Sequence, residues 1–179
     1  MKTTVLILPG FGSSGPTHWQ SLWEGPNPDF KRVEQRDWEH PVCEEWVHAL
    51  EKALEECDAE VILVAHSLAC LVVAQWANRP HKRIKGALLV APPDTLSTHF
   101  PSAALGFDLT SLHPFDFPSM VLASTNDVYA SIEYTDHLAS LWGSTFINVG
   151  ALGHINTDSA LGFWDEGFAL FEALRKVSY

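Results

Sequence analysis

Three residues of the chain, Ser67, Asp127 and His154, have the side chains that nucleophilic catalysis needs, and each follows a short apolar run. A serine hydroxyl becomes a strong nucleophile when a base removes its proton. A histidine serves as that base when a carboxylate fixes its tautomer and stabilises its cationic form. If the chain brings these three side chains together, the chemistry is acyl transfer through the serine hydroxyl.

The residues around Ser67 indicate how its hydroxyl would be presented. The stretch Ala65-His66-Ser67-Leu68-Ala69 separates an apolar run from a mostly apolar helical pattern, which is the position of a nucleophile elbow. The usual pattern there is G-x-S-x-G, because strand and helix pass close to the turn, and alanine meets that need less well than glycine. The alternative interpretation makes Ser67 a helix N-cap. We interpret His66 as a packing or orienting residue, because a sequence neighbour points away across a sharp turn.

The candidate acid and base occupy two later loops. Asp127 follows the predicted strand Met120–Ala123 in a turn-forming cluster, where a solvated turn aspartate is the alternative interpretation. Asp94 also leaves a strand end, but the strand–Asp–helix spacing favours Asp127 as the acid. His154 follows the predicted strand Thr145–Val149 in a glycine-containing loop.

An attacked acyl carbonyl becomes an oxyanion, which requires backbone donors placed beforehand. One donor is expected to be the N–H of Leu68, the residue after the nucleophile. The second is expected from the loop "PGFGSSG", with Phe11 as the first choice and Gly12 as the alternative.

The same loop also matches the dinucleotide-binding pattern G-x-G-x-x-G through Gly10, Gly12 and Gly15. That alternative needs an acid about 20 residues further on, and Glu34 is the nearest candidate. It predicts only a short helix before Gly25-Pro26, and it leaves the serine, aspartate and histidine loops without a role. We therefore expect no nucleotide cofactor.

The elements that must position these residues alternate between short apolar strands and helices, as in a parallel sheet covered on both faces. We expect about six strands in a mostly parallel sheet, forming a three-layer α/β/α sandwich with its ligand site at the carboxyl ends of the strands. The expected strands are Thr4–Leu8, Arg32–Gln35, Val61–Val64, Ile84–Val90, Met120–Ala123 and Thr145–Val149. The expected helices are Pro16–Trp23, Pro41–Cys57, Ser67–Asn78, Ile132–Trp142 and Asp158–Lys176, the last with Asp158 as its N-cap.

Length and composition narrow the class of protein. A chain of 179 residues predicts one domain over residues 1–179. The net charge of -11 disfavours nucleic acid and anionic membranes as partners. Three cysteines without a C-x-x-C pattern, and no visible secretory signal, indicate reduced thiols in a cytoplasmic protein. The histidine spacings predict no metal site, and no feature of the sequence identifies a protein partner.

Four motifs, "LPGFGSS…THWQ", "LVAHSLAC", "STNDVY" and "GHIN", make the chain resemble small serine hydrolases of the retinoblastoma-binding protein nine type. The resemblance implies a minimal α/β-hydrolase fold without a large cap domain, and the order Ser, Asp, His agrees with that fold. It places nucleophile, acid and base on Ser67, Asp127 and His154. It implies hydrolysis of carboxylic esters or related thioesters and amides, with a small-molecule acyl substrate and no cofactor.

The substrate pocket is less clearly indicated by the sequence. His18 and Trp19 match a His-Trp element of the family's first loop, and we expect both near the pocket. Phe100 and Phe107 belong to an irregular segment, Ala91–Pro118, that either forms a flap over the site or simply packs. An alternative function is an interaction protein that keeps the fold without catalysis, because alanines flank Ser67.

Overall fold

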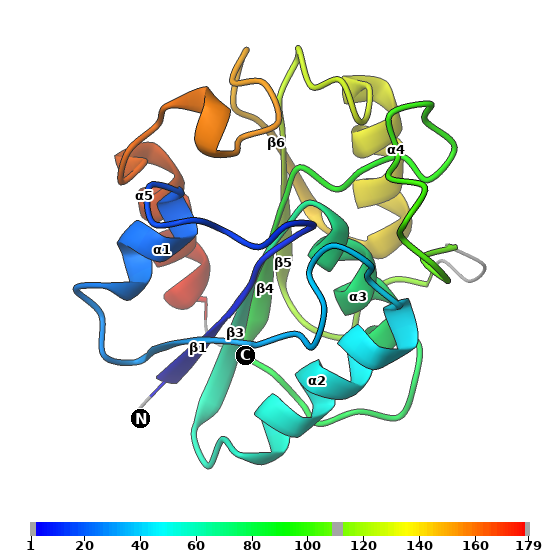
Figure 1. The fold of residues 1–179 in the computed structure, drawn as a ribbon. Coiled ribbons are helices and arrows are strands. Elements are labelled where there is room, and N and C mark those ends of the chain that lie inside the picture. The colour runs from blue at the N-terminus through cyan, green and yellow to red at the C-terminus, as the bar shows by residue number, and fades with distance from the viewer. Residues whose placement is uncertain (1–2, 109–112, 178–179) are drawn as a thin grey trace.

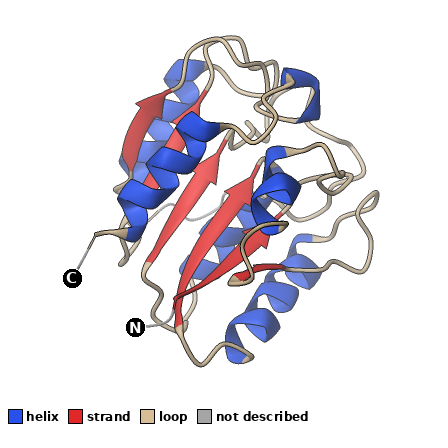
Figure 2. Cartoon of the chain, turned by 90° about the vertical axis from the view of Figure 1, so that its left-hand side faces the viewer, coloured by secondary structure: helices blue, strands red, loops and turns tan. Residues whose placement is uncertain are grey.

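Six parallel strands form the central sheet of the protein, in the order β2-β1-β3-β4-β5-β6. The computed structural model describes residues 3–108 and 113–177. All neighbouring strands run parallel, which makes the sheet more regular than the mostly parallel one expected (Figure 2). The strands are β1 Thr3–Leu8, β2 Phe30–Arg32, β3 Glu60–His66, β4 Gly86–Val90, β5 Ser119–Ala123 and β6 Thr145–Asn148.

Helices cover both faces of this sheet, so the predicted three-layer α/β/α sandwich is confirmed (Figure 1). Helices α1 and α5 pack on one face, and α2, α3 and α4 pack on the other. Among the described residues no separate cap domain covers the sheet, and no helix is long and apolar enough to cross a membrane. The helices are α1 Trp19–Glu24, α2 Cys43–Glu55, α3 Leu68–Ala77, α4 Ile132–Trp142 and α5 Asp165–Arg175, with a short 3-10 turn, η1, at Thr157–Ser159.

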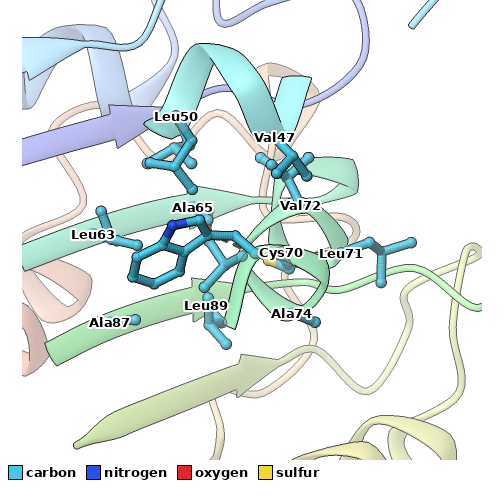
Figure 3. Packing of buried hydrophobic residues seen from close by; sticks show 14 of the residues in the cluster. Val47, Leu50, Leu63, Ala65, Cys70, Leu71, Val72, Ala74, Ala87 and Leu89 are labelled. Atoms are coloured by element: carbon cyan, nitrogen blue, oxygen red, sulfur yellow. Dashed lines mark hydrogen bonds between the residues drawn. The ribbon is translucent and has the colours of Figure 1, made fainter. Parts of the chain in front are cut away.

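The central strands are apolar at nearly every position because both of their faces are buried. In β3, Leu63 and Ala65 contact the cluster under α2 and α3, whereas Ile62 and Val64 contact the cluster under α1 and α5. Figure 3 shows the first cluster, in which side chains of α2, α3, β3 and β4 interdigitate. Each valine, leucine or isoleucine side chain among them contributes about 1.5–3 kcal/mol when fully buried. The buried core of the molecule is therefore built on the sheet, from which the loops leave at the carboxyl ends of the strands.

Strand order places those loops on one edge. The chain moves outward from β1 to β2, and then crosses back to β3 and continues through β4, β5 and β6. The loops after β1 and β3 therefore leave from adjacent strands and turn toward opposite faces of the sheet. Ligands bind at such a point in open parallel sheets. The loops after β5 and β6 leave from the same edge.

The C-terminal helix differs from the sequence expectation, which began it at Asp158. Helix α5 starts seven residues later, at Asp165. The backbone adopts positive φ at Ala160, Gly162 and Trp164, and each such residue interrupts a right-handed helix. Asp158 lies in the 3-10 turn η1, so its predicted role as the N-cap of a long helix was wrong.

Candidate active site

Ser67 occupies a strained turn between β3 and α3. Its φ of 54° and ψ of -124° lie in a region that non-glycine residues rarely adopt. The Ser67 N–H donates to the carbonyl of Val90 at 2.8 Å, and its own carbonyl accepts the N–H of Cys70 at 2.9 Å. Ser67 occupies the N-cap position of α3, but its side chain makes no capping hydrogen bond to the helix. Ala65 and Ala69 are both buried beside the turn.

Ser67, His154 and Asp127 lie in hydrogen-bond contact. The Nε2 atom of His154 is 2.7 Å from the Oγ atom of Ser67, and Nδ1 is 2.8 Å from Oδ2 of Asp127 and 3.0 Å from Oδ1. Because an ionised carboxylate can only accept a hydrogen bond, Nδ1 carries the proton and donates to it, and the lone pair of Nε2 faces the serine hydroxyl. The side chains of Asp127 and His154 are only 4 % and 9 % exposed, which limits screening by water.

The alternative acid, Asp94, has a different set of contacts. Its Oδ1 atom accepts the N–H of Leu96 at 2.8 Å, and its own N–H donates to the carbonyl of Tyr129 at 3.0 Å. Oδ1 of Asp127 accepts the N–H of Tyr129, which fixes the carboxylate that faces His154. Asp94 therefore closes a neighbouring turn and does not contact the histidine.

Two polar side chains that the sequence analysis did not single out join the acid loop to the base loop. Asn126 Oδ1 accepts the N–H of Gly153 at 2.7 Å, and Ser124 Oγ accepts the N–H of Leu152 at 2.8 Å. Ser124 Oγ in turn donates to Asn126 Oδ1. Both are turn-forming residue types that shortly precede Asp127, and this position in the sequence is the signal that could have identified them.

A buried histidine, His66, holds the backbone of the candidate base, His154. Its Nε2–H donates to the carbonyl of His154 at 3.0 Å, as the expected orienting role requires. Burial lowers the pKa of His66 well below its usual value, and the nearby His18 and His154 lower it further. His66 is therefore neutral near pH 7, so that Nε2 carries the proton and Nδ1 does not.

His18 lies beside His66, with ring centroids 4.9 Å apart, and lines the candidate site as expected. Its Nδ1 accepts the N–H of Gln20, and its Nε2 has no partner among the described residues. Burial, followed by the charges of Arg32 and His154, lowers the pKa of His18 to about 4. The His18 and His66 rings meet edge-on and the His66 and His154 rings are tilted, so the three imidazoles form a row in which His18 and His66 are neutral near pH 7.

The loop after β1 approaches the elbow through Gly10. A Cβ atom at this position would lie 2.9 Å from Ser67 Cβ and 3.0 Å from the carbonyl oxygen of His66, so only glycine fits without movement. The N–H of Gly12 is used, because it donates to the carbonyl of Trp38 at 3.0 Å. Within the described part of the chain the N–H of Phe11 has no acceptor, and Phe11 and Leu68 both line the cavity beside Ser67.

Gln20, which the sequence analysis also missed, links this loop to the nucleophile strand. Its fully buried amide donates from Nε2 to the carbonyls of Leu8 and Val64, each at 3.1 Å, and accepts the hydroxyl of Ser14 at 2.6 Å. Leu8 ends β1, and Val64 lies three residues before Ser67. No local pattern indicates these contacts, because Val64 is distant in sequence.

The dinucleotide-binding alternative is not supported by this geometry. Gly10 is required by the serine elbow, and a Cβ atom at Gly15 would meet nothing within 4 Å. Helix α1 is only six residues long and begins at Trp19, and Glu34 is exposed. The glycine pattern therefore serves the turn that reaches Ser67.

A cavity of roughly 260 Å³ opens over the serine and histidine. Trp19, Phe100 and Phe107 do not line it. Trp19 is in the core under α1, and Phe107 packs on Trp46 of α2. Phe100 packs against the same cluster as Phe107, the one under α2 and α3, and its sequence neighbours His99 and Pro101 line the cavity instead. Besides Phe11, Leu68 and the histidines described above, the cavity is lined by Ser13, Ser67, Pro93, His99, Pro101, Tyr129, Asn156 and Thr157.

No group of three or more histidine, cysteine or acidic side chains in residues 3–108 and 113–177 is arranged to hold a metal ion. His18, His66 and His154 contact one another through edge-on or tilted rings, and their nitrogen atoms have other partners or none. The arrangement is suited to proton transfer between His154 and Ser67.

A parallel α/β sandwich with a serine on the turn after a central strand and a histidine after the last strand defines an α/β-hydrolase. The chain belongs to the serine hydrolase family, whose model matches residues 5–173. A search of curated proteins found no match.

Solved structures agree with this assignment. The chain is 30% identical to a putative YdeN-like hydrolase from Pectobacterium atrosepticum, with a TM-score of 0.85 over 97% of this chain and 92% of that one. The ydeN gene product of B. subtilis is 19% identical, with a TM-score of 0.83 over 98% and 100%. The RedJ thioesterase of the prodiginine pathway in Streptomyces coelicolor shares the fold at 15% identity, with a TM-score of 0.67 over 98% and 85%.

Proposed function

We propose that the protein hydrolyses carboxylic esters, or related thioesters and amides, through an acyl-enzyme formed on Ser67. The observation that carries this proposal is the continuous hydrogen-bond chain from Asp127 through His154 to Ser67, with distances of 2.8 and 2.7 Å. These hydrogen bonds support a catalytic role more than a non-catalytic one, because a surface that only binds a partner does not need them.

In the proposed mechanism, Ser67 Oγ forms a bond to the acyl carbon while its proton passes to Nε2 of His154. Asp127 keeps the Nδ1 proton in place and stabilises the imidazolium. His154 then returns the proton to the leaving alcohol, thiol or amine as its bond to the acyl carbon breaks. A water molecule, activated by His154, attacks the acyl-enzyme, and the acid leaves as Ser67 regains its proton.

The oxyanion formed in each step is assigned to the N–H groups of Leu68 and Phe11. Engagement of the Gly12 N–H by Trp38 favours Phe11 as the second donor. Both donors are backbone groups, so their positions depend on how closely the loop after β1 approaches the elbow.

We expect Gly10→Ala to lower kcat by about 10²–10³-fold, which is the usual effect of losing one oxyanion donor. The added methyl group must displace either the Ser67 turn or the Phe11 loop. Gly15→Ala is the matched control, since its methyl group would meet no atom within 4 Å. Initial rates with p-nitrophenyl acetate, and thermal unfolding of both variants, measure the difference. A Gly10→Ala enzyme with wild-type kcat would contradict the assignment of this loop.

The cavity supports a small, uncharged acyl substrate. Its volume of roughly 260 Å³ lies below the ~300–1,000 Å³ of sites for drug-sized ligands. Among the described residues that line it there is no Asp, Glu, Lys or Arg. A charged acyl group would lose its hydration there without gaining a partner of opposite charge.

The relatives support the same reaction class. Among proteins that share the fold, one is described as an esterase, from Thermogutta terrifontis, at 18% identity with a TM-score of 0.69 over 98% of this chain and 90% of that one. RedJ is described as a thioesterase. Within the serine hydrolases, the motifs around residues 8–20, 63–70, 124–129 and 153–156 lead us to place the chain with the retinoblastoma-binding protein nine type.

A fluorophosphonate probe tests the proposal directly, because it reacts with an activated serine. We expect labelling of the wild-type protein on Ser67 alone, located by mass spectrometry of the digested protein. Burial raises the pKa of the Cys43 thiol to about 12 and also raises that of Cys70, so these thiols do not compete as nucleophiles. A panel of p-nitrophenyl esters should then show faster turnover of short acyl chains. Folded protein that is not labelled would instead favour a non-catalytic role.

We also infer a single domain over residues 1–179, because all six strands join one sheet. The three cysteines are buried and free, which supports a reducing compartment such as the cytoplasm. The net charge of -11 supports neither nucleic acid nor an anionic membrane as a partner.

A further inference from the structure

Trp19 connects the short helix α1 to the loop that carries the catalytic base. Its indole Nε1–H donates to the carbonyl of Ile155 at 2.8 Å, and Ile155 directly follows His154. Trp19 is 1 % exposed, so water does not compete for this bond. The hydrogen bond joins the first turn of α1 to the peptide next to the base.

The Ile155 backbone needs such a restraint. Its φ is 50°, in the left-handed region that β-branched residues avoid because Cβ approaches the backbone too closely. A residue in this conformation is held there by its surroundings, at a cost of about 1–3 kcal/mol. Two successive carbonyls of this loop accept side-chain donors: His154 from His66, and Ile155 from Trp19.

The Trp19 ring is itself held in place by other aromatic rings. Its centroid lies 4.6 Å from that of Trp23 and 5.3 Å from that of Trp164, within the cluster between the sheet and helices α1 and α5. The position of the indole N–H is therefore set by the core and not by the base loop. This makes the indole a rigid anchor for a strained peptide.

We propose that Trp19 is a positioning residue that keeps His154 aligned with Ser67 by holding the Ile155 carbonyl. The inference rests on the proposed hydrolase function. Without the indole N–H, the peptide after His154 is free to rotate toward an unstrained φ, and the imidazole moves away from Ser67 Oγ. A displacement of about 1 Å in such a site costs about 10²-fold in rate.

The test compares Trp19→Phe with Trp23→Phe. Trp23 is also fully buried in α1, and its Nε1–H donates to the carbonyl of Phe163 at 2.5 Å, which the 3-10 turn η1 separates from His154. Each substitution removes one indole N–H and part of one ring from the same cluster. We expect similar losses of thermal stability, but only Trp19→Phe should lower kcat, by about 10–100-fold with KM within twofold. Labelling of Ser67 by the fluorophosphonate should slow to the same extent.

Equal kcat values for the two variants would overturn the proposal. Should Trp19→Phe fail to fold, benzothienylalanine at position 19 supplies the same shape without the N–H, and wild-type kcat for that variant would overturn the proposal as well. Failure of the hydrolase proposal is measured separately, by labelling and ester turnover of the wild-type protein. If Ser67 of the wild-type protein is not labelled and the protein does not turn over esters, the hydrolase proposal fails and this inference fails with it. If the wild-type protein is labelled and active and the Trp19→Phe variant is unimpaired, the hydrolase proposal stands and only the role of Trp19 is contradicted.

Discussion

Replacing Ser67 by alanine is expected to lower the turnover of p-nitrophenyl acetate by up to ~10⁶-fold while the protein stays folded. The substitution removes the Oγ atom that lies 2.7 Å from His154 and leaves no group able to form the acyl-enzyme. Alanine at position 67 experiences the same positive φ as serine, so the backbone strain does not change. Burst and steady-state kinetics, with circular dichroism and thermal unfolding, measure the outcome.

The matched control for this substitution is Ser140→Ala, on the exposed side of α4. It removes the same hydroxyl far from the carboxyl edge of the sheet and should leave kcat and unfolding temperature unchanged. A folded Ser67→Ala protein that hydrolyses the ester as fast as the Ser140→Ala protein would remove Ser67 from the mechanism. It would also refute the acyl-enzyme.

Asp127→Asn is expected to have the second-largest effect, a loss of about 10⁴-fold in kcat. Oδ1 of residue 127 accepts the N–H of Tyr129, and an asparagine keeps that bond by placing its oxygen there. Its NH₂ group then faces Nδ1 of His154, which must accept instead of donate. The imidazole proton moves to Nε2, where it points at Ser67 Oγ and prevents His154 from acting as the base.

Asp94→Asn is the control for this prediction, because it makes the same change in the alternative acid. Asn can still accept the N–H of Leu96, the side-chain hydrogen bond that Asp94 makes, so kcat should stay within twofold of the wild type. The pair is measured by kcat over a range of pH with unfolding as a check. A large loss in Asp94→Asn together with a small one in Asp127→Asn would reverse the assignment of the acid.

Much of the fold was predictable because the parallel strands are buried on both faces and their sequences are apolar throughout. Short runs such as Val61–Val64 marked the strand centres, and residues beyond their ends then fell at one edge of the sheet. The helix over Ile132–Trp142 was predicted to the residue, since Ser131 caps its start and Gly143, with φ of 66°, ends it.

The parts that the sequence did not indicate depend on packing that a local pattern of residue types does not show. The late start of α5 depends on positive φ at Trp164, whose ring packs against Gly167 so closely that a Cβ there would lie 2.2 Å from a ring atom. Phe107 was expected at the cavity because it lies in an irregular segment, but its contact with Trp46 depends on where α2 packs. The role of Gln20 depends on Val64, 44 residues away.

The hydrogen bond between Trp19 and Ile155 joins residues 136 positions apart, and this separation has a consequence for biosynthesis. Contacts between distant residues form late, because a long chain must lose conformational freedom before they can stabilise it. A ribosome-bound chain that has reached Val149 already contains Ser67 and Asp127 but lacks the proposed base, His154. The proposed hydrolysis therefore becomes possible only after the loop with His154 has been made and has reached helix α1, which is synthesised much earlier.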